Sequence, residues 1–169
     1  MIACLDVQYA ESGACAAALV FECWESEKPI LEKQIYLHKI EKYEPGSFYK
    51  RELPPLLELL SHLPSQPDIL LIDGYCDLSA DGMPGLGARL FEQLPYSPVI
   101  VGVAKNRFKG TLHAKEVFRG DSSRPLFVTS IGITKEEAAE KVAAMHGKYR
   151  IPTMLKAVDN LARSSCGHS

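Results

Sequence analysis

Two acidic residues lie where an acid is costly, in or directly after an apolar segment of the sequence. Asp6 stands in the middle of the first apolar run, residues 2–9, and Asp73 closes the run at residues 69–72. A carboxylate in a core strand costs free energy unless it is paired or binds a metal. Several carboxylates that converge on one point can hold Mg²⁺ for phosphodiester cleavage. Taken alone, Asp73 also fits a strand-end turn before Gly74, and Asp6 also fits a partnered buried acid or an acid on an edge strand.

Two further acids have weaker individual signals. Glu52 stands at the start of a predicted helix, where acids are common because they interact favourably with the helix dipole. Asp159 falls in the predicted last helix, where a solvated acid is the ordinary case. Their significance depends on whether the fold brings them to Asp6 and Asp73.

The composition is that of a single globular domain. The chain has 169 residues, of which 46% are hydrophobic, and its 19 Lys and Arg against 21 Asp and Glu give a net charge of −2. This charge argues against a highly basic, non-specific nucleic-acid binder. The sequence contains no apolar run of about 18 residues, which a membrane-spanning helix would need. The five cysteines lack zinc-ligand spacing, so we expect reduced thiols in a cytoplasmic protein.

The first part of the sequence predicts three strands that are joined by short turns. The turn signals stand at residues 11–13 and 28–29. Connections this short favour an antiparallel meander. The apolar or alternating segments that form the predicted strands are 2–9, 15–23 and 30–38.

The rest of the chain alternates between helices and apolar strands. A stripe of leucines predicts a helix over residues 51–63, which should begin near Arg51 or Glu52 because Pro54 and Pro55 fit only in a first turn. The other predicted elements are a buried strand at 68–73, a loop at 74–85, a helix to Gln93, a strand at 98–104, a polar excursion at 105–125, a short strand at 126–129, a helix from the Thr134 capping box to His146, and a last helix at 153–163.

This order of elements predicts an α/β domain with a mixed sheet, in which three antiparallel strands precede parallel strands that alternate with helices. It is the order of ribonuclease H-like domains. We expect one such domain over residues 1–163 and a flexible tail at 164–169. The four acids then fall where ribonuclease H-like nucleases carry theirs: on the first strand, the first helix, the end of the fourth strand and the last helix.

Several short segments fit the pattern of one known family. Residues 43–54 (YEPGSFYKRELP) resemble the endonuclease V pattern Y-x-P-G-x-L-x-F-R-E-x-P. This family cuts DNA near deoxyinosine or RNA near inosine. Other similar segments are 2–9 and 68–74, which resemble its strands with metal-binding aspartates, 101–105 (VGVAK), 124–128 (RPLFV) and 149–152 (YRIP). The resemblance covers nearly the whole chain.

The resemblance implies a metal-dependent endonuclease of nucleic-acid repair or processing. Its substrate would be DNA or RNA with a modified base, and it would need no nucleotide cofactor. Lys105 would lie beside the scissile phosphate and stabilise negative charge there. The residues implied to bind Mg²⁺ or Mn²⁺ are Asp6, Glu52, Asp73 and Asp159.

A second group of residues would contact the nucleic acid. By the resemblance, the loop around Tyr43 would form a wedge that stacks on a base, and Gly74 would let the backbone approach closely. Residues 105–124 hold six Lys or Arg against two acids, a net +4 that fits phosphates or, alternatively, a solvated polar loop. The expected contact residues are Tyr43, Pro45, Gly46, Gly74, Arg107 and Lys109.

One loop departs from the family pattern D-G-x-G-x-x-H-P-R. Residues 73–81 read DGYCDLSAD, so Cys76 replaces the second Gly, and Ser79, Ala80 and Asp81 replace His-Pro-Arg. Inosine specificity is therefore open.

The alternative to an active endonuclease is a catalytically inactive relative that binds nucleic acid or a protein. A small-molecule enzyme is disfavoured, because residues 82–87 (GMPGLG) lack the Lys-Ser/Thr of a phosphate-binding loop. A zinc hydrolase is disfavoured because the sequence contains no H-E-x-x-H motif.

Overall fold

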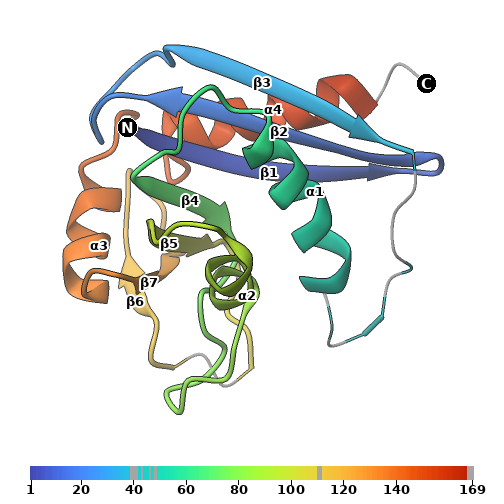
Figure 1. The fold of residues 1–169 in the computed structure, drawn as a ribbon. Helices are drawn as coiled ribbons and strands as arrows, with labels where there is room; N and C mark the ends of the chain where they lie inside the picture. The colour runs from blue at the N-terminus through green and yellow to red at the C-terminus, as the bar shows by residue number, and fades with distance from the viewer. Residues whose placement is uncertain (39–41, 43, 46, 48, 110–111, 167–169) are drawn as a thin grey trace.

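The computed structural model describes residues 1–38, 42, 44, 45, 47, 49–109 and 112–166. Within these residues, seven strands form one mixed sheet in the order β3-β2-β1-β4-β5-β7-β6 (Figure 1). The strands are β1 (Ile2–Ala10), β2 (Gly13–Phe21), β3 (Leu31–Leu37), β4 (Ile69–Asp73), β5 (Val99–Ala104), β6 (Lys115–Val117) and β7 (Leu126–Ile131). The helices are α1 (Tyr49–Ser61), α2 (Leu86–Gln93), α3 (Lys135–Ala143) and α4 (Thr153–Cys166).

Helices cover both faces of the sheet, and alternate strand residues supply the two cores. Ala3 and Leu5 of β1 pack with α1 and α2, whereas Ile2 and Cys4 pack with α3 and α4. Strand β2 is buried along its whole length. Its alanines allow helices to lie close on either side, with α1 in front and α4 behind in Figure 1.

The predicted meander and the two buried parallel strands are confirmed. Strands β1, β2 and β3 pair antiparallel, and β4 pairs parallel to both β1 and β5. The predicted start of the second strand at Cys15 is wrong, because β1 and β2 are joined by only two residues and Ala10 already pairs with Gly13.

The far side of the sheet adds detail that the sequence did not give. The short strand expected at 126–129, for which no direction was predicted, is β7 and runs antiparallel to β5. The chain between them contains no helical crossover in the described residues, and a parallel return requires one. The predicted polar excursion also contains β6, whose three residues are too few for a hydrophobic period.

The helix ends differ from the prediction in three places. Helix α1 begins at Tyr49, so Pro54 and Pro55 lie in its second turn, where their missing N–H groups withhold the usual hydrogen bonds to carbonyls four residues earlier. Helix α3 ends at Ala143 rather than His146. Helix α4 continues to Cys166, so residues 164–166 are helical and not the predicted tail. Residues 167–169 lie outside the described residues.

The predicted helix cap at Thr134 is confirmed. Thr134 caps α3, because its side chain accepts a hydrogen bond from the Glu137 amide at 3.1 Å. None of the five cysteines, all of which are described, forms a disulfide. Across the described part of the chain, no helix is long and apolar enough to cross a membrane. The cytoplasmic location and the limits of the domain remain predictions.

Candidate active site

Neighbouring parallel strands bring Asp6 and Asp73 together. Leu5 of β1 pairs with Ile72 of β4, so the next residue on each strand is an acid at the same level of the sheet. Asp6 is only 9% exposed, whereas the Asp73 side chain is half exposed. The two acids therefore lie at one edge of the sheet, with Asp73 on the solvent side.

Helix α1 places Glu52 beside the same two acids. Glu52, Asp6 and Asp73 line one small cavity. Burial raises the pKa of Glu52 to about 7, and the charges of Asp73 and Asp6 add to this effect. Burial likewise raises the pKa of Asp6 to about 6, with Asp73 and Asp159 as further causes. Asp73 is thus close enough to Glu52 and to Asp6 for its charge to oppose the ionisation of both.

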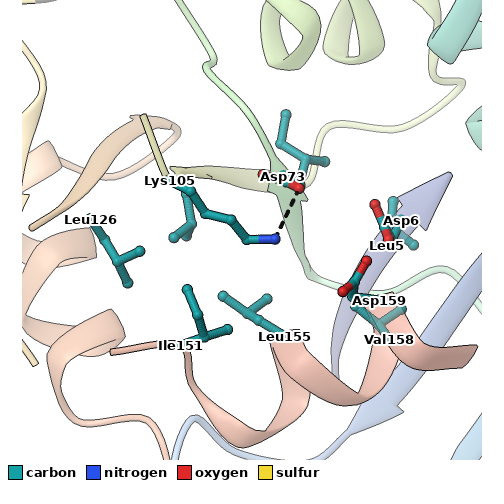
Figure 2. A pocket seen from close by; sticks show the side chains of 11 residues that line it. Leu5, Asp6, Asp73, Lys105, Leu126, Ile151, Leu155, Val158 and Asp159 are labelled. Atoms are coloured by element: carbon teal, nitrogen blue, oxygen red, sulfur yellow. Dashed lines mark ion pairs between the residues drawn. The ribbon is translucent and has the colours of Figure 1, made fainter. Parts of the chain in front are cut away.

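Asp159 reaches the site from α4 on the other face of the sheet. Figure 2 shows its carboxylate next to that of Asp6. The amide Nε2 of Gln8 donates to Asp6 Oδ2 at 3.0 Å and to Asp159 Oδ1 at 3.1 Å. Burial by itself would raise the pKa of Asp159, but the hydrogen bond and charge of Arg163 lower it. Asp159 therefore accepts hydrogen bonds from an amide and from a basic side chain, whereas Arg51 acts on Glu52 through its charge.

Lys105 lies just beyond the end of β5, next to β4. Its Nζ is 3.5 Å from Asp73 Oδ2, and it lines a pocket with Asp6, Asp73 and Asp159 (Figure 2). The guanidinium of Arg150 donates to the carbonyl of Lys105 and, at 2.9 Å, to that of Pro125. Arg150, which sequence reasoning placed only in a motif, therefore anchors the backbone that carries Lys105.

The acids have the chemistry of a divalent-cation site. Carboxylate oxygens are the ligands that Mg²⁺ and Mn²⁺ prefer. A bound cation would offset the two effects that raise the pKa values of Glu52 and Asp6, which are burial first and the charges of the neighbouring acids second. Among the described residues, no three His, Cys, Asp or Glu side chains are already arranged as ligands around one ion. The donor set fits such an ion, but its side chains would have to move together to bind it.

A larger pocket of about 490 Å³ opens beside Glu52 and Asp73. Its walls come from α1, from the loop after β4, from the start of α2 and from Phe108. The Tyr75 hydroxyl donates to the carbonyl of Asn106 at 2.6 Å and accepts from the Phe108 amide at 3.2 Å. Tyr75 thus joins the two loops that form the pocket, which is mainly apolar and has room for a planar ring.

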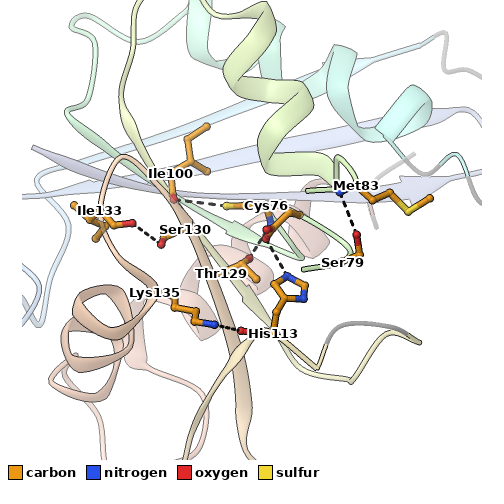
Figure 3. Close-up of polar contacts among 10 residues, drawn as sticks. Cys76, Ser79, Met83, Ile100, His113, Thr129, Ser130, Ile133 and Lys135 are labelled. Carbon is orange, nitrogen blue, oxygen red and sulfur yellow. Dashed lines mark hydrogen bonds and ion pairs between the residues drawn. The ribbon is translucent and has the colours of Figure 1, made fainter. Parts of the chain in front are cut away.

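The loop after β4 is fixed to the sheet and to the loop that follows β5 (Figure 3). The Cys76 amide donates to Thr129 Oγ1 at 2.8 Å, and His113 Nε2 lies 3.1 Å from Asp77 Oδ1. Lys135 Nζ in turn donates to the His113 carbonyl at 2.6 Å. The backbone of Gly74 has φ +144°, which favours glycine. These contacts hold the pocket walls in place.

The residues at the altered positions of this loop lie mostly away from the pocket. Ala80 and Asp81 are exposed on a turn, and Ser79 Oγ accepts from the Met83 amide at 3.2 Å within that turn. Leu78 and Met83, on either side of the turn, line the pocket. The departure from the family pattern therefore changes the rim of the pocket more than its inner wall.

Apart from Gly74, which follows β4 beside the pocket, the predicted nucleic-acid contacts divide into three groups. Arg107 forms an ion pair with Glu116 and lies 4.7 Å above the Phe127 ring, while Lys109 is exposed. Pro45 stands in an exposed turn. Tyr43 and Gly46 lie outside the described residues.

The net +4 of residues 105–124 overstates the charge available to a ligand. Arg119 is only 6% exposed, and its guanidinium donates to four backbone carbonyls in residues 145–150. Its role is structural. Lys105 and Arg107 already face acids, which leaves Lys109, Lys115 and Arg124 as the exposed basic residues whose side chains form no ion pair in the described part of the segment.

The family model of endonuclease V matches residues 1–160. The chain belongs to the endonuclease V family. Endonuclease V of Desulfurococcus amylolyticus is 30% identical over an alignment that covers 88% of this chain and 68% of the relative. Endonuclease V of Azotobacter vinelandii is 29% identical over an alignment that covers 96% of this chain and 81% of that relative. In other bacterial relatives this chain spans 60% of the length.

Solved endonuclease V structures have the same fold. The enzyme from Ciona intestinalis, in complex with a 24mer DNA that contains an inosine, has a TM-score of 0.80 at 19% identity and covers 98% of this chain and 85% of its own. The Streptomyces avermitilis endonuclease V has a TM-score of 0.75 at 23% identity, and the match covers 98% of this chain and 81% of that one. The predicted ribonuclease H-like architecture is thereby confirmed.

Proposed function

We propose that the protein is a metal-dependent endonuclease that hydrolyses a phosphodiester of DNA or RNA near inosine or another modified base. The observation that carries this proposal is the convergence of Asp6, Glu52 and Asp73 on one cavity, with Lys105 beside them. Three buried or half-buried acids with one nearby cation form a costly arrangement for a purely structural role. Membership of the endonuclease V family supports the same activity.

In this proposal, Asp6, Glu52 and Asp73 hold Mg²⁺ or Mn²⁺, and Asp159 completes the acidic set. When bound there, such an ion would supply Lewis-acid chemistry for a water and for the phosphate. Lys105 leaves Asp73, from which its Nζ is 3.5 Å away, to neutralise charge that develops on a phosphate oxygen. Arg150 keeps the Lys105 backbone in position during this exchange.

The pocket beside Glu52 and Asp73 gives the nucleic acid a place to bind. An extrahelical base would enter between Tyr75 and Phe108, which is 41% exposed at the rim. The Ciona relative, which was solved with inosine-containing DNA, supports this use of the fold. Tyr43, Pro45 and Gly46 would act as the wedge, Gly74 would allow close backbone approach, and Lys109 with Arg107 would face phosphates.

The second candidate function is a binding protein that kept the fold without cleavage. The residues that favour it are Ser79, Ala80 and Asp81, because they put an acid where the family pattern has a cation. Their exposed turn lies off the inner pocket wall, and the acids of the candidate centre are all present. The endonuclease is therefore the better supported function.

A cleavage panel tests the proposal. Labelled DNA and RNA oligonucleotides that carry inosine, uracil, an abasic site, a flap or no modification are incubated with the protein in Mg²⁺, in Mn²⁺ and in EDTA. We expect metal-dependent cleavage of at least one modified substrate and its loss in Asp73→Ala. Binding without cleavage in either metal, across the panel, would contradict the endonuclease and support the binding relative.

A further inference from the structure

Two large aromatic side chains are exposed on adjoining segments outside the candidate site. Tyr149, in the turn before α4, is 69% exposed, and Phe118, just after β6, is 58% exposed. A single exposed ring needs no explanation, but two rings on adjoining segments form a surface on which a ligand can pack.

The buried Arg119 joins the two segments that carry these rings. Its guanidinium donates to four backbone carbonyls in residues 145–150, among them that of Tyr149 at 2.7 Å. Gly120 brings the backbones into close contact, because a Cβ at that position would lie 2.6 Å from the carbonyl oxygen of Lys148. Tyr149 and Phe118 are therefore carried by one fixed scaffold.

This scaffold lies at the edge of the sheet where Lys105 lies. Strands β5 and β6 end opposite the first two residues of β7, so both end at the same edge. Lys105 and Phe118 are the residues that follow these two strands. Arg150, which comes directly after Tyr149, donates to the carbonyl of Lys105. A strand that passes Lys105 can therefore continue onto the aromatic surface.

The charges around the two rings are mainly basic. Lys148 Nζ lies 5.3 Å from the centre of the Tyr149 ring. Lys148 and Arg124 are exposed and form no ion pair in the part of the chain that the structure describes. Asp121 is the exposed acid between Phe118 and Arg124. Two free cations against one acid suit a ligand with negative charge.

A hollow of about 530 Å³ adjoins the Tyr149 ring, which gives a planar group room beside it. The acid that approaches this hollow is Glu27, whose carboxylate lies 3.5 Å from His146 Nε2. The residues that line it are His146, Gly147, Lys148, Tyr149 and Thr153.

From these observations we propose that Tyr149 and Phe118 form a stacking platform for unpaired bases in the flank of the substrate strand, with Lys148 and Arg124 facing its phosphates. Aromatic rings stack on the faces of bases of any sequence, whereas the bases inside a duplex already stack on one another. The platform therefore selects a single-stranded flank. The proposal goes beyond the proposed function and rests on it only in taking nucleic acid as the ligand.

Fluorescence anisotropy in EDTA tests the platform without any cleavage. Labelled, unmodified single strands of DNA and of RNA, about 12 nucleotides long, are titrated with the full chain, and a duplex of the same sequence is titrated in parallel. We expect both single strands to bind more tightly than the duplex. Tyr149→Ser and Phe118→Ser should each weaken single-strand binding about tenfold, which is the loss expected for one stacked base.

Two further variants separate stacking from a general effect on the surface. Tyr149→Phe keeps the ring and should bind within about twofold of the wild type. Ile30→Ser is the matched control, because Ile30 is 53% exposed but lies just before β3, at the opposite edge of the sheet. It should leave single-strand affinity unchanged.

The charge of Lys148 has its own measurable effect. Lys148→Gln should lower the slope of log affinity against log salt concentration by about 0.7, the value for one phosphate contact on a single strand. A photoreactive 5-iodouracil in the oligonucleotide should cross-link to Tyr149 or Phe118, and peptide mass spectrometry identifies the attached residue.

The contradicting results are distinct from those that bear on cleavage. Unchanged affinity in both serine variants, an equal loss in Ile30→Ser, or equal binding of duplex and single strand would overturn the platform and leave the proposed endonuclease intact. If the serine variants change only the mass of the chain in solution, the surface is a contact between copies and the proposal is wrong. Single-strand binding that depends on both rings, without cleavage of any substrate in the panel, would keep the platform and contradict the endonuclease.

Discussion

The acidic centre and the pocket beside it are built in different ways. The centre takes its acids from regular elements: β1, α1, the end of β4 and α4. The pocket takes most of its wall from two loops, which are joined by Tyr75 and by the pair of His113 with Asp77. Regular elements fix the geometry that chemistry needs, and loops tolerate the changes that alter recognition. The departures from the family pattern at Cys76, Ser79, Ala80 and Asp81 fall in the pocket loop and leave the acids in place.

The largest effect should come from the acidic centre. Asp73→Asn should lower the single-turnover cleavage rate on the order of 10³-fold, since a lost metal ligand removes several kcal/mol of stabilisation. Asp68→Asn is the matched control: Asp68 lies just before β4, pairs with the N-terminal amine at 2.6 Å and has a side chain that is 80% exposed. Equal cleavage rates for the two variants would show that the acidic centre does not take part in the reaction.

The second largest effect on cleavage should come from a substitution of Lys105. Lys105→Met should slow cleavage roughly 100-fold, as expected when one group that stabilises developing charge is lost, and should leave Mn²⁺ affinity nearly unchanged. Lys156→Met, an exposed lysine on α4, serves as control. Rates and metal isotherms measured on the same preparations check this. A large loss of metal affinity in Lys105→Met would assign the lysine to the metal site rather than to the phosphate.

A substitution in the pocket should change selectivity more than rate. Tyr75→Phe removes the hydroxyl that binds Asn106 and Phe108. With each hydrogen bond contributing about 1 kcal/mol, we expect the ratio of kcat/KM for the preferred modified base over the unmodified strand to fall about tenfold. Tyr96→Phe, a tyrosine near a different pocket, should have no such effect. A loss of kcat as large as in Asp73→Asn would contradict the separation of chemistry from recognition.

The smallest effect concerns stability in the absence of metal. Because the pKa of Glu52 is raised from 4.5 to about 7, the folded state holds this proton more tightly, and stability falls as pH rises from about 4.5 to 7. In EDTA, Glu52→Gln should therefore melt a few degrees above the wild type at pH 8, since about 1 kcal/mol corresponds to roughly 2–4 °C in a domain of this size. At pH 4 the difference should disappear. Thermal melts at both pH values measure it.

The positions of three of the acids in the fold could be predicted from the sequence because each stands beside a periodic signal, whereas Glu52 and Asp159 were assigned to the site by the order of elements and the family resemblance. Asp6 and Asp73 interrupt or close apolar strands, and Glu52 opens a helix marked by leucines. Strand pairing then brings Asp6 and Asp73 to one level. The direction of β7 was not predictable in this way, because direction depends on the path of the whole connection from β5.

The partners of these acids could not be predicted from the sequence. Gln8 meets Asp159 across 151 positions, and Arg150 meets the Lys105 backbone across 45, with no local pattern to indicate either contact. A count of charges likewise could not show that Arg119 is buried on backbone carbonyls. Polar side chains take their roles from tertiary contacts, which periodicity does not encode.

Metal binding and cleavage measured in the same samples test the central claim most directly. Mn²⁺ is titrated into the wild type with a modified-base oligonucleotide that the panel shows to be cut, and free Mn²⁺ and product are followed together. The account predicts that product formation rises with occupancy of the site, and that Asp73→Asn loses both. Full occupancy without product, or cleavage that persists in EDTA, would contradict it.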